Sequence, residues 1–162
     1  PKLSIPLALS VGISGKDEVL ELELFRSMPP EIVVESLCRQ IPEGIHILSG
    51  VHMPGTEKGS ARDVVYEVVF KDQGLLKTLQ ISEFLQQPPI TVNRTKDGQQ
   101  KSFNIRPSIQ EISVKPDRLI LSMKMGSEST ERPEEVIHSL LKKKKKELFE
   151  IIRTKVNLSS SA

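Results

Sequence analysis

The chain has 162 residues, of which 37% are hydrophobic and 27% charged, a profile typical of a globular protein with one ordinary domain or two small ones. Its single cysteine excludes an intramolecular disulfide and any cysteine-based iron–sulfur or zinc site within this chain, and it fits a reducing compartment. The formal net charge is +2, but residues 142–155 hold seven basic and two acidic residues, so the rest of the chain has a net charge of −3. A polyanion would therefore meet local basic patches and no generally basic surface.

The ends of the chain carry no targeting segment that we can identify. No apolar run approaches the roughly 20 residues that span a bilayer, so no contact with a membrane is expected. There is no signal peptide. The chain begins with Pro1-Lys2 and lacks an initial Met, from which we expect it to be a piece of a longer protein.

The first half, residues 1–60, is predicted to fold as strand, strand, helix, strand. Alternating apolar residues indicate the first two strands, which are expected to pair as a hairpin. Pro29-Pro30-Glu31 is typical of the first turn of a helix, and Pro42-Glu43-Gly44 ends it. In chain order the predicted elements are strands at 3–12 and 19–24, a helix at 30–41, a strand at 45–48 and a boundary loop at 52–60.

The second half, residues 61–141, repeats this order without a detectable sequence repeat. Its strands and helices alternate in the same way, and a second short helical turn is expected from Ser82-Glu83 before Pro88-Pro89 ends the helical stretch. In chain order the predicted elements are a strand at 64–70, helical structure at 74–87, a hairpin at 90–114 whose second strand bulges or changes facing, a strand at 119–125, a polar loop at 126–131 and a helix at 132–141.

Basic residues gather on the predicted hairpin. Its turn is expected at Asp97-Gly98, a pair that tolerates the positive φ angles of a tight turn. The hairpin carries four cations, Arg94, Lys96, Lys101 and Arg106, against the single acid Asp97 in its turn. These side chains could contact phosphates. The alternative is a solvated hairpin whose charges prevent aggregation of its edges.

The tail, residues 142–162, begins with five lysines that interrupt the apolar face of the preceding helix. Residues 149–156 are predicted to form either a last helix or, as we favour, a closing strand, and residues 157–162 are expected to be disordered. The lysine run could simply be a solvated helix end. With Arg153 and Lys155 it could also add non-specific, salt-sensitive attraction to RNA.

The element order predicts an α+β fold of two ferredoxin-like halves (βαββαβ) with mainly antiparallel sheets. The first half is incomplete at its N-terminus and would need a strand and a helix before Pro1.

Catalytic and metal-binding patterns are weak. The three histidines, His46, His52 and His138, lie in a predicted strand, loop and helix and accompany no nucleophile pattern. No catalytic residue and no metal ligand is therefore predicted, and no glycine-rich phosphate loop is present.

Several segments together resemble the radical-SAM-associated domain. They are residues 1–4 (PKLS) with 12–24 (GISGKDEVLELEL), residues 30–48 (PEIVVESLCRQIPEGIHIL), residues 94–98 with 105–107 (RTKDG and IRP) and residues 126–136 (GSESTERPEEV). The chain departs from the family pattern at Ser14-Gly15 and at Asn104, where an acid-serine pair and an Asp are usual.

The resemblance implies an accessory or substrate-recognition domain of a radical SAM protein. S-adenosylmethionine and the iron–sulfur cluster would then belong to the upstream radical SAM domain, which becomes the expected partner, and this chain would need no cofactor. The family's link to RNA metabolism implies tRNA, rRNA or the ribosome as further partners, in a bacterial-type cytoplasm or a plastid stroma. The residues expected to touch RNA are Arg94, Lys96, Lys101, Arg106 and Arg132. The alternatives are a structural module that docks on the radical SAM core without nucleic acid and, least supported, an independent enzyme.

Overall fold

The computed structural model describes residues 1–53, 59–96, 98–126, 132–142 and 148–159, with the backbone alone for Lys96. It is an α+β structure with mainly antiparallel sheets, which confirms the predicted fold class. Part of the predicted boundary loop, most of the polar loop at 126–131, Asp97, Lys143 to Lys146 and the last three residues lie outside the described residues.

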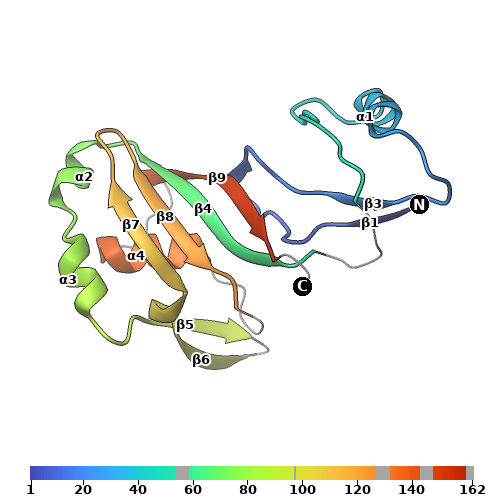
Figure 1. The fold of residues 1–162 in the computed structure, drawn as a ribbon. Coiled ribbons are helices and arrows are strands. Elements are labelled where there is room, and N and C mark those ends of the chain that lie inside the picture. Colours follow the sequence, from blue (N-terminus) through green and yellow to red (C-terminus); the bar gives the residue numbers. More distant parts are fainter. Residues whose placement is uncertain (54–58, 97, 127–131, 143–147, 160–162) are drawn as a thin grey trace.

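A five-stranded sheet is built mainly from strands of the second half and from one strand of the predicted tail (Figure 1). Four of its strands run antiparallel to their neighbours in the order β9-β4-β8-β7. In chain order these are the fourth, first, third and second strands, which is the order of a ferredoxin-like unit. The strands are β4 (Ala61–Phe70), β7 (Ile109–Val114), β8 (Leu119–Lys124) and β9 (Phe149–Leu158).

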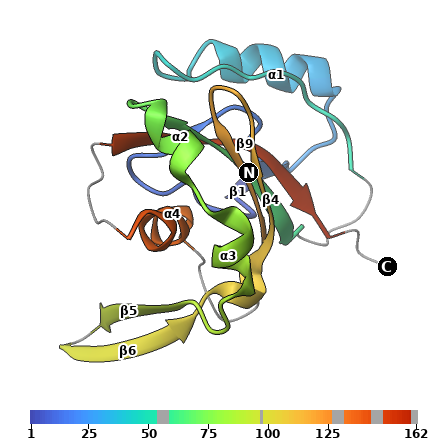
Figure 2. The ribbon, with the colours of Figure 1, turned by 90° about the vertical axis from the view of Figure 1, so that its left-hand side faces the viewer.

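Three helices cover one face of this sheet (Figure 2). The alternation predicted for β4 is observed, because Val64, Tyr66, Val68 and Phe70 are buried while the residues between them are partly exposed. They pack in one core with apolar residues of the helices, among them Leu76, Phe84, Val136 and Ile137. The helices are α2 (Gly74–Thr78), α3 (Ile81–Gln86) and α4 (Pro133–Leu141), so the helical stretch predicted at 74–87 is indeed broken in two.

The basic hairpin is confirmed as strands β5 (Thr91–Lys96) and β6 (Gln99–Asn104), which pair antiparallel. Gly98 has a φ of +75°, as expected for its place in the turn. The second strand predicted to continue to residue 114 is interrupted, because the 3-10 helix η1 (Arg106–Ser108) separates β6 from β7, which pairs with β8 in the five-stranded sheet. The bulge expected in this segment is present as a shift in the β7–β8 register between Ile109 and Glu111.

The closing strand predicted at 149–156 is confirmed as β9, which pairs with β4 along its length. The expectation of disorder from residue 157 is wrong for Asn157 and Leu158, which belong to this strand. The ladder continues because Ala61 of β4 still faces Leu158, and the Ser159 amide donates to the Ser60 carbonyl.

The first half extends away from the sheet beyond β9 (Figure 1). Its strands β1 (Lys2–Ser4) and β3 (Glu21–Glu23) pair antiparallel, as predicted, and α1 (Pro30–Cys38) follows. The two-residue strand β2 (Ser14–Gly15) joins the main sheet, parallel to β9.

Two predictions for the first half are wrong. Residues 45–48 form no strand, because no other described segment lies alongside them to share a hydrogen-bond ladder. The strand predicted at 3–12 ends at Ser4, because the Leu7 and Ala8 carbonyls accept hydrogen bonds from Arg153 instead of from a neighbouring strand. The described part of the first half therefore holds a two-stranded sheet and a helix, short of a ferredoxin-like sheet.

Candidate functional site

The predicted basic site centres on Arg94 of β5, whose side chain is largely buried against α4. Its Nε lies 2.9 Å from Oε1 of Glu135 and its Nη2 lies 2.6 Å from Oε2, a bidentate ion pair. The guanidinium also lies over the Phe103 ring, 4.8 Å from its centroid. Such an arrangement combines paired hydrogen bonds with a cation–π contact, so Arg94 joins the hairpin to α4.

Arg106 makes a second such junction at the base of the hairpin. Its Nε donates to the Leu85 carbonyl at 2.9 Å and its Nη1 donates to the Ile109 carbonyl at 3.1 Å. The side-chain oxygen of Asn104 accepts from the amides of Ile90 and Arg106. Through this oxygen Asn104 holds the two ends of the hairpin together at its base.

The three other predicted contacts are placed differently. Lys101 lies opposite Arg94 in the β5–β6 register and is exposed. Arg132 is exposed just before α4, and Lys96 is described by its backbone alone. The structure therefore brings Arg94 and Lys101 onto one hairpin and places Arg106 at its base in η1. Contact of any of the five residues with RNA stays a prediction.

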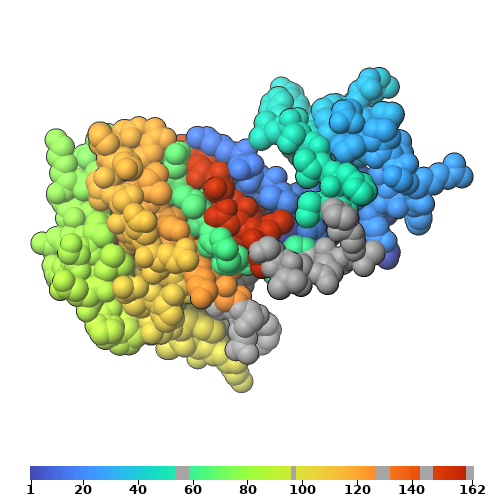
Figure 3. Space-filling model, in the orientation of Figure 1, coloured from blue at the N-terminus to red at the C-terminus, as the bar shows by residue number. Residues whose placement is uncertain are grey.

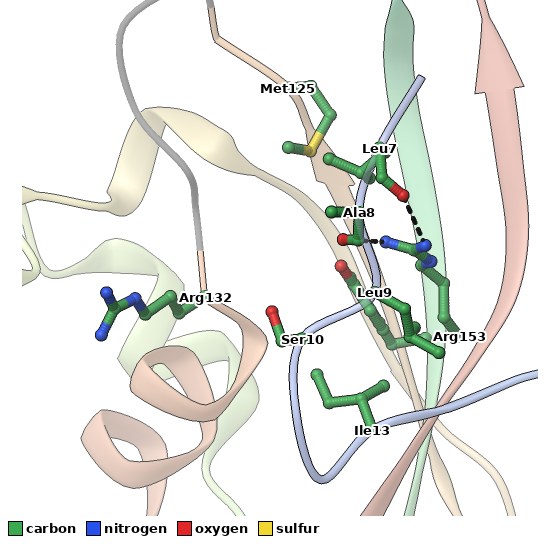
Figure 4. A pocket seen from close by; sticks show the side chains of 9 residues that line it. Leu7, Ala8, Leu9, Ser10, Ile13, Met125, Arg132 and Arg153 are labelled. Atoms are coloured by element: carbon green, nitrogen blue, oxygen red, sulfur yellow. Dashed lines mark hydrogen bonds between the residues drawn. The ribbon is translucent and has the colours of Figure 1, made fainter. Parts of the chain in front are cut away.

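A pocket of about 170 Å³ lies where the first half meets the sheet (Figure 4). Residues 7–10 and Ile13 form one side of it, and Tyr66, Met125, Arg132 and Arg153 complete it. Figure 4 shows the Arg132 guanidinium directed away from that of Arg153. The pocket thus does not focus two positive charges on one point.

Arg153 of β9 is the buried cation beside this pocket, at 2% exposure. Its Nε lies 2.8 Å from Oε1 of Glu18, and its Nη2 contacts the other carboxylate oxygen. Its guanidinium also donates to the carbonyls of Leu7 and Ala8. Burial works against the charged guanidinium, but Glu18 outweighs it and the pKa of Arg153 lies above its ordinary value. Arg153 is therefore buried and paired with Glu18, so its charge is not exposed to RNA. Attraction of RNA by the other basic residues of the tail stays a prediction.

The absence of a side chain at Gly15 leaves room for the Glu18 carboxylate in this ion pair. A Cβ atom on Gly15 would lie 2.5 Å from Oε1 of Glu18, so glycine leaves the space that the carboxylate fills. Beside them, burial raises the pKa of the Tyr66 hydroxyl, which stays protonated at neutral pH. These groups join the first half to the sheet and form no nucleophile–base pair.

The described ranges hold neither a metal-binding cluster nor a helix that could span a membrane. Nowhere in them do three His, Cys, Asp or Glu side chains lie close enough to hold a metal ion. Each helix of the described chain is too short or too polar to cross a bilayer.

An apolar surface on the first half is the feature that sequence reasoning missed. Of 13 large apolar side chains that are exposed in the described chain, 12 belong to the first half, and α1 buries none of its residues. Val11 is 99% exposed and Phe25 is 88% exposed. The apolar alternation in the sequence shows these residues but not whether anything covers them. We call this set the docking face: Leu3, Ile5, Leu9, Val11, Leu20, Phe25, Met28, Ile32, Ile45, Leu48, Val51 and Met53.

Comparison with protein families finds one match. The pattern of DUF2344, described as an uncharacterized protein conserved in bacteria, matches residues 1–148. Comparisons with curated proteins and with solved structures each found no match.

Proposed function

Since this chain belongs to the DUF2344 family of uncharacterized proteins conserved in bacteria, we propose that it is a non-catalytic interaction module whose first half docks on another protein. Its second half, with a complete core, would act as the rigid support of the docking face.

The observation that supports this proposal is the exposure of the docking face. Burying apolar surface stabilises a complex by roughly 25 cal/mol per Å², and a concentration of exposed apolar side chains on one part of a molecule is typical of interaction sites. Figure 3 shows the first half as a protruding part of the molecule, joined to the sheet beside β9. A protruding part with an apolar surface can be enclosed by a partner without changes in the second half.

We propose a radical SAM protein as the partner, on the strength of the sequence resemblance. The cluster and S-adenosylmethionine would be held by that protein, and the module would shape or support its active site. The single cysteine of this chain, Cys38, cannot by itself hold such a cluster, which needs several thiolates.

Co-purification tests this proposal. The chain would be co-expressed with a tagged radical SAM protein of its source organism, and binding of the purified pair would be measured by calorimetry. Phe25→Glu is expected to weaken binding at least tenfold, because it places a charge in the docking face. Val114→Glu is the matched control, since Val114 is 44% exposed on the second half. The proposal fails if the pair does not bind, or if both variants bind equally well.

RNA recognition is the second candidate function. It is favoured by the exposed Lys101 on the projecting hairpin and by the composition of residues 142–155, where six basic residues besides the buried Arg153 stand against two acidic ones. The mode of recognition would be electrostatic, because no aromatic side chain lies on the open face of the sheet, where it could stack on bases. Four of the six aromatic residues are buried, namely Tyr66, Phe70, Phe84 and Phe149. Of the other two, Phe103 lies under Arg94 and Phe25 lies in the first half.

Fluorescence anisotropy with tRNA and rRNA fragments at several salt concentrations tests this second candidate. Lys101→Glu is expected to weaken binding and to reduce the salt dependence, whereas Lys77→Glu on α2 serves as a control of equal charge change. Absence of binding at low salt would exclude it.

A further inference from the structure

The pocket where the first half meets the sheet has one wall that the protein itself holds in place. This wall is the segment from Leu7 to Ser10. The Leu7 and Ala8 carbonyls accept hydrogen bonds from the buried Arg153, and the Ile13 amide donates to the Ser10 carbonyl at 3.2 Å. Figure 4 shows the segment between the strands on one side and the start of α4 on the other. Sites that bind small molecules are usually pre-formed in this way.

The size and the apolar walls of the pocket fit the body of a small ligand. Its volume is about 170 Å³. An apolar cavity of about 150 Å³ is large enough for benzene, so a body of about six carbon atoms can enter this pocket. Apolar side chains for it to contact are those of Leu7, Leu9, Ile13 and Met125. Burial against them would remove the body of the ligand from water.

The polar side chains that line the pocket can all donate hydrogen bonds, and none of them is an acid: Ser10, Tyr66, Arg132 and Arg153. Tyr66 is only 4% exposed. Burial raises the pKa of its hydroxyl, which is therefore protonated at neutral pH, and Arg153 favours the hydroxyl oxygen as an acceptor. Within the described chain this hydroxyl donates no hydrogen bond. Its hydrogen is thus available to an acceptor on a ligand.

Arg132 adds a positive charge to the pocket. Its side chain is exposed, and no acid of the described chain forms an ion pair with it. Arg153, by contrast, is neutralised by Glu18. In Figure 4 the Arg132 guanidinium is directed away from that of Arg153, and an exposed, unpaired side chain can turn toward a ligand without losing an ion pair. Carboxylates are the groups that the arginine fork binds with two parallel hydrogen bonds.

We propose that this pocket binds a small carboxylic acid, in its carboxylate form, with an apolar body of about six carbon atoms. The body would pack against Leu9, Ile13 and Met125. The Tyr66 hydroxyl and the Arg132 guanidinium would donate to the carboxylate oxygens. A neutral analogue of the same shape would keep the packing and lose the ion pair, and a cationic analogue would be repelled by Arg132.

This inference goes beyond the proposed function, because it needs this chain alone and no other protein. Leu9 is the one residue that belongs to both the pocket and the docking face. The two ideas can fail separately. Phe25→Glu addresses docking and lies outside the pocket, whereas Arg132→Gln addresses the pocket and lies outside the docking face.

Methionine methyl groups can report where a ligand binds. The chain has four methionines. Met125 lines the pocket, Met123 is buried in the core, and Met28 and Met53 are exposed on the docking face. In the full chain labelled with ¹³C at the methionine methyl groups, titration with benzoate is expected to shift the Met125 signal until it saturates. The signals of Met28 and Met53 should stay unchanged, and Met125→Leu identifies the signal of Met125.

Two analogues of the same shape separate charge from packing. At pH 7 benzamide is neutral and benzylamine is positively charged. Benzoate is expected to bind at least about threefold more tightly than benzamide, and benzylamine most weakly. Arg132→Gln should remove the preference for benzoate and leave the affinity for benzamide unchanged. Arg26→Gln is the matched control, since Arg26 is exposed and does not line the pocket, and it should bind like the wild type.

Two further variants test the pocket itself. Tyr66→Phe removes the buried donor and is expected to weaken benzoate and benzamide alike, by about two- to tenfold. Ser10→Phe puts a bulky ring at an exposed lining position and should abolish binding of both, and it decides the matter if circular dichroism shows that Tyr66→Phe does not fold. The proposal is overturned if benzoate leaves Met125 unmoved, shifts Met28 and Met53 as strongly, or binds no more tightly than benzamide. It is equally overturned if Arg132→Gln keeps the preference for benzoate.

Discussion

The strand β4 and residues 45–53 are both rich in apolar residues, yet their surroundings are opposite. Val64 and Val68 of β4 are fully buried, whereas Val51 is 77% exposed. β4 has a strand on each side and three helices over one face, while the 45–53 segment has α1 on one side and no strand beside it in the described chain. An apolar pattern thus indicates that a segment favours burial, but the burial itself depends on whether other segments of the chain pack against it.

Two arginines offer a second comparison between the halves. Arg153 joins the first half to the sheet through Glu18, and Arg94 joins the hairpin to α4 through Glu135. Both arginines lie in basic segments that the sequence predicts to be exposed to solvent. Their measured contribution to stability would show how firmly each appended part is held.

The largest effect is expected from Arg153→Ala. Removing one partner of a buried ion pair leaves the other uncompensated, so we expect a loss of about 3–5 kcal/mol in the free energy of unfolding. Urea unfolding followed by circular dichroism measures it. Lys155→Ala, on the same strand but exposed, should change stability by less than about 0.5 kcal/mol. Equal losses in the two variants would show that the ion pair does not hold the halves together.

Core truncation tests the contrast between buried and exposed apolar residues directly. Leu121→Ala on β8 is expected to cost about 2–5 kcal/mol, because it removes a fully buried side chain and leaves a cavity. Leu48→Ala in the 45–53 segment should cost less than about 0.5 kcal/mol. A large loss for Leu48→Ala would mean that the segment is already buried in solution.

A smaller loss is expected for Arg94→Ala, which removes a bidentate pair with a carboxylate. Hydrogen bonds to charged groups contribute about 1.5–3 kcal/mol each in mutational series, and we expect a loss within that range in chemical unfolding. Lys101→Ala, its exposed neighbour across the ladder, should be nearly neutral. Arg94→Lys should recover part of the loss, since lysine keeps the charge but not the planar fork.

The smallest effect is the expected loss of stability when the pH is lowered. The pKa of Asp63 is lowered below its ordinary value, first by the Asn157 amide and then by Arg62, both of which favour the carboxylate. A carboxyl with a depressed folded-state pKa stabilises the protein above its unfolded pKa and loses this contribution as the pH falls through its folded pKa. Between pH 6 and pH 2.5, urea unfolding of the wild type should therefore lose up to about 1 kcal/mol more stability than that of Asp63→Asn. Equal losses would contradict it.

The local elements were largely predictable because each depends on near neighbours in the chain. Proline and acid at the start of α1 and α4, alternation in β4 and β9 and the glycine turn of the hairpin are patterns of a few residues. The hairpin could be placed in this way, and with it three of the five expected RNA contacts, Arg94, Lys96 and Lys101. What these cations do was not predictable, because Glu135 lies 41 residues from Arg94. Burial of Arg153 left one trace in the sequence, its place in line with the inward residues Phe149 and Ile151.

By itself, the sequence determined the α+β class, most helices and strands, and the absence of an internal disulfide, since these follow from short-range pattern and composition. The tertiary structure alone decided that Arg153 and Arg94 are internal ties, that residues 45–48 form no strand, and that the apolar side chains of the first half stay exposed. The physical reason is that burial and pairing depend on which distant segments meet. A residue's own neighbours in the chain do not carry that information.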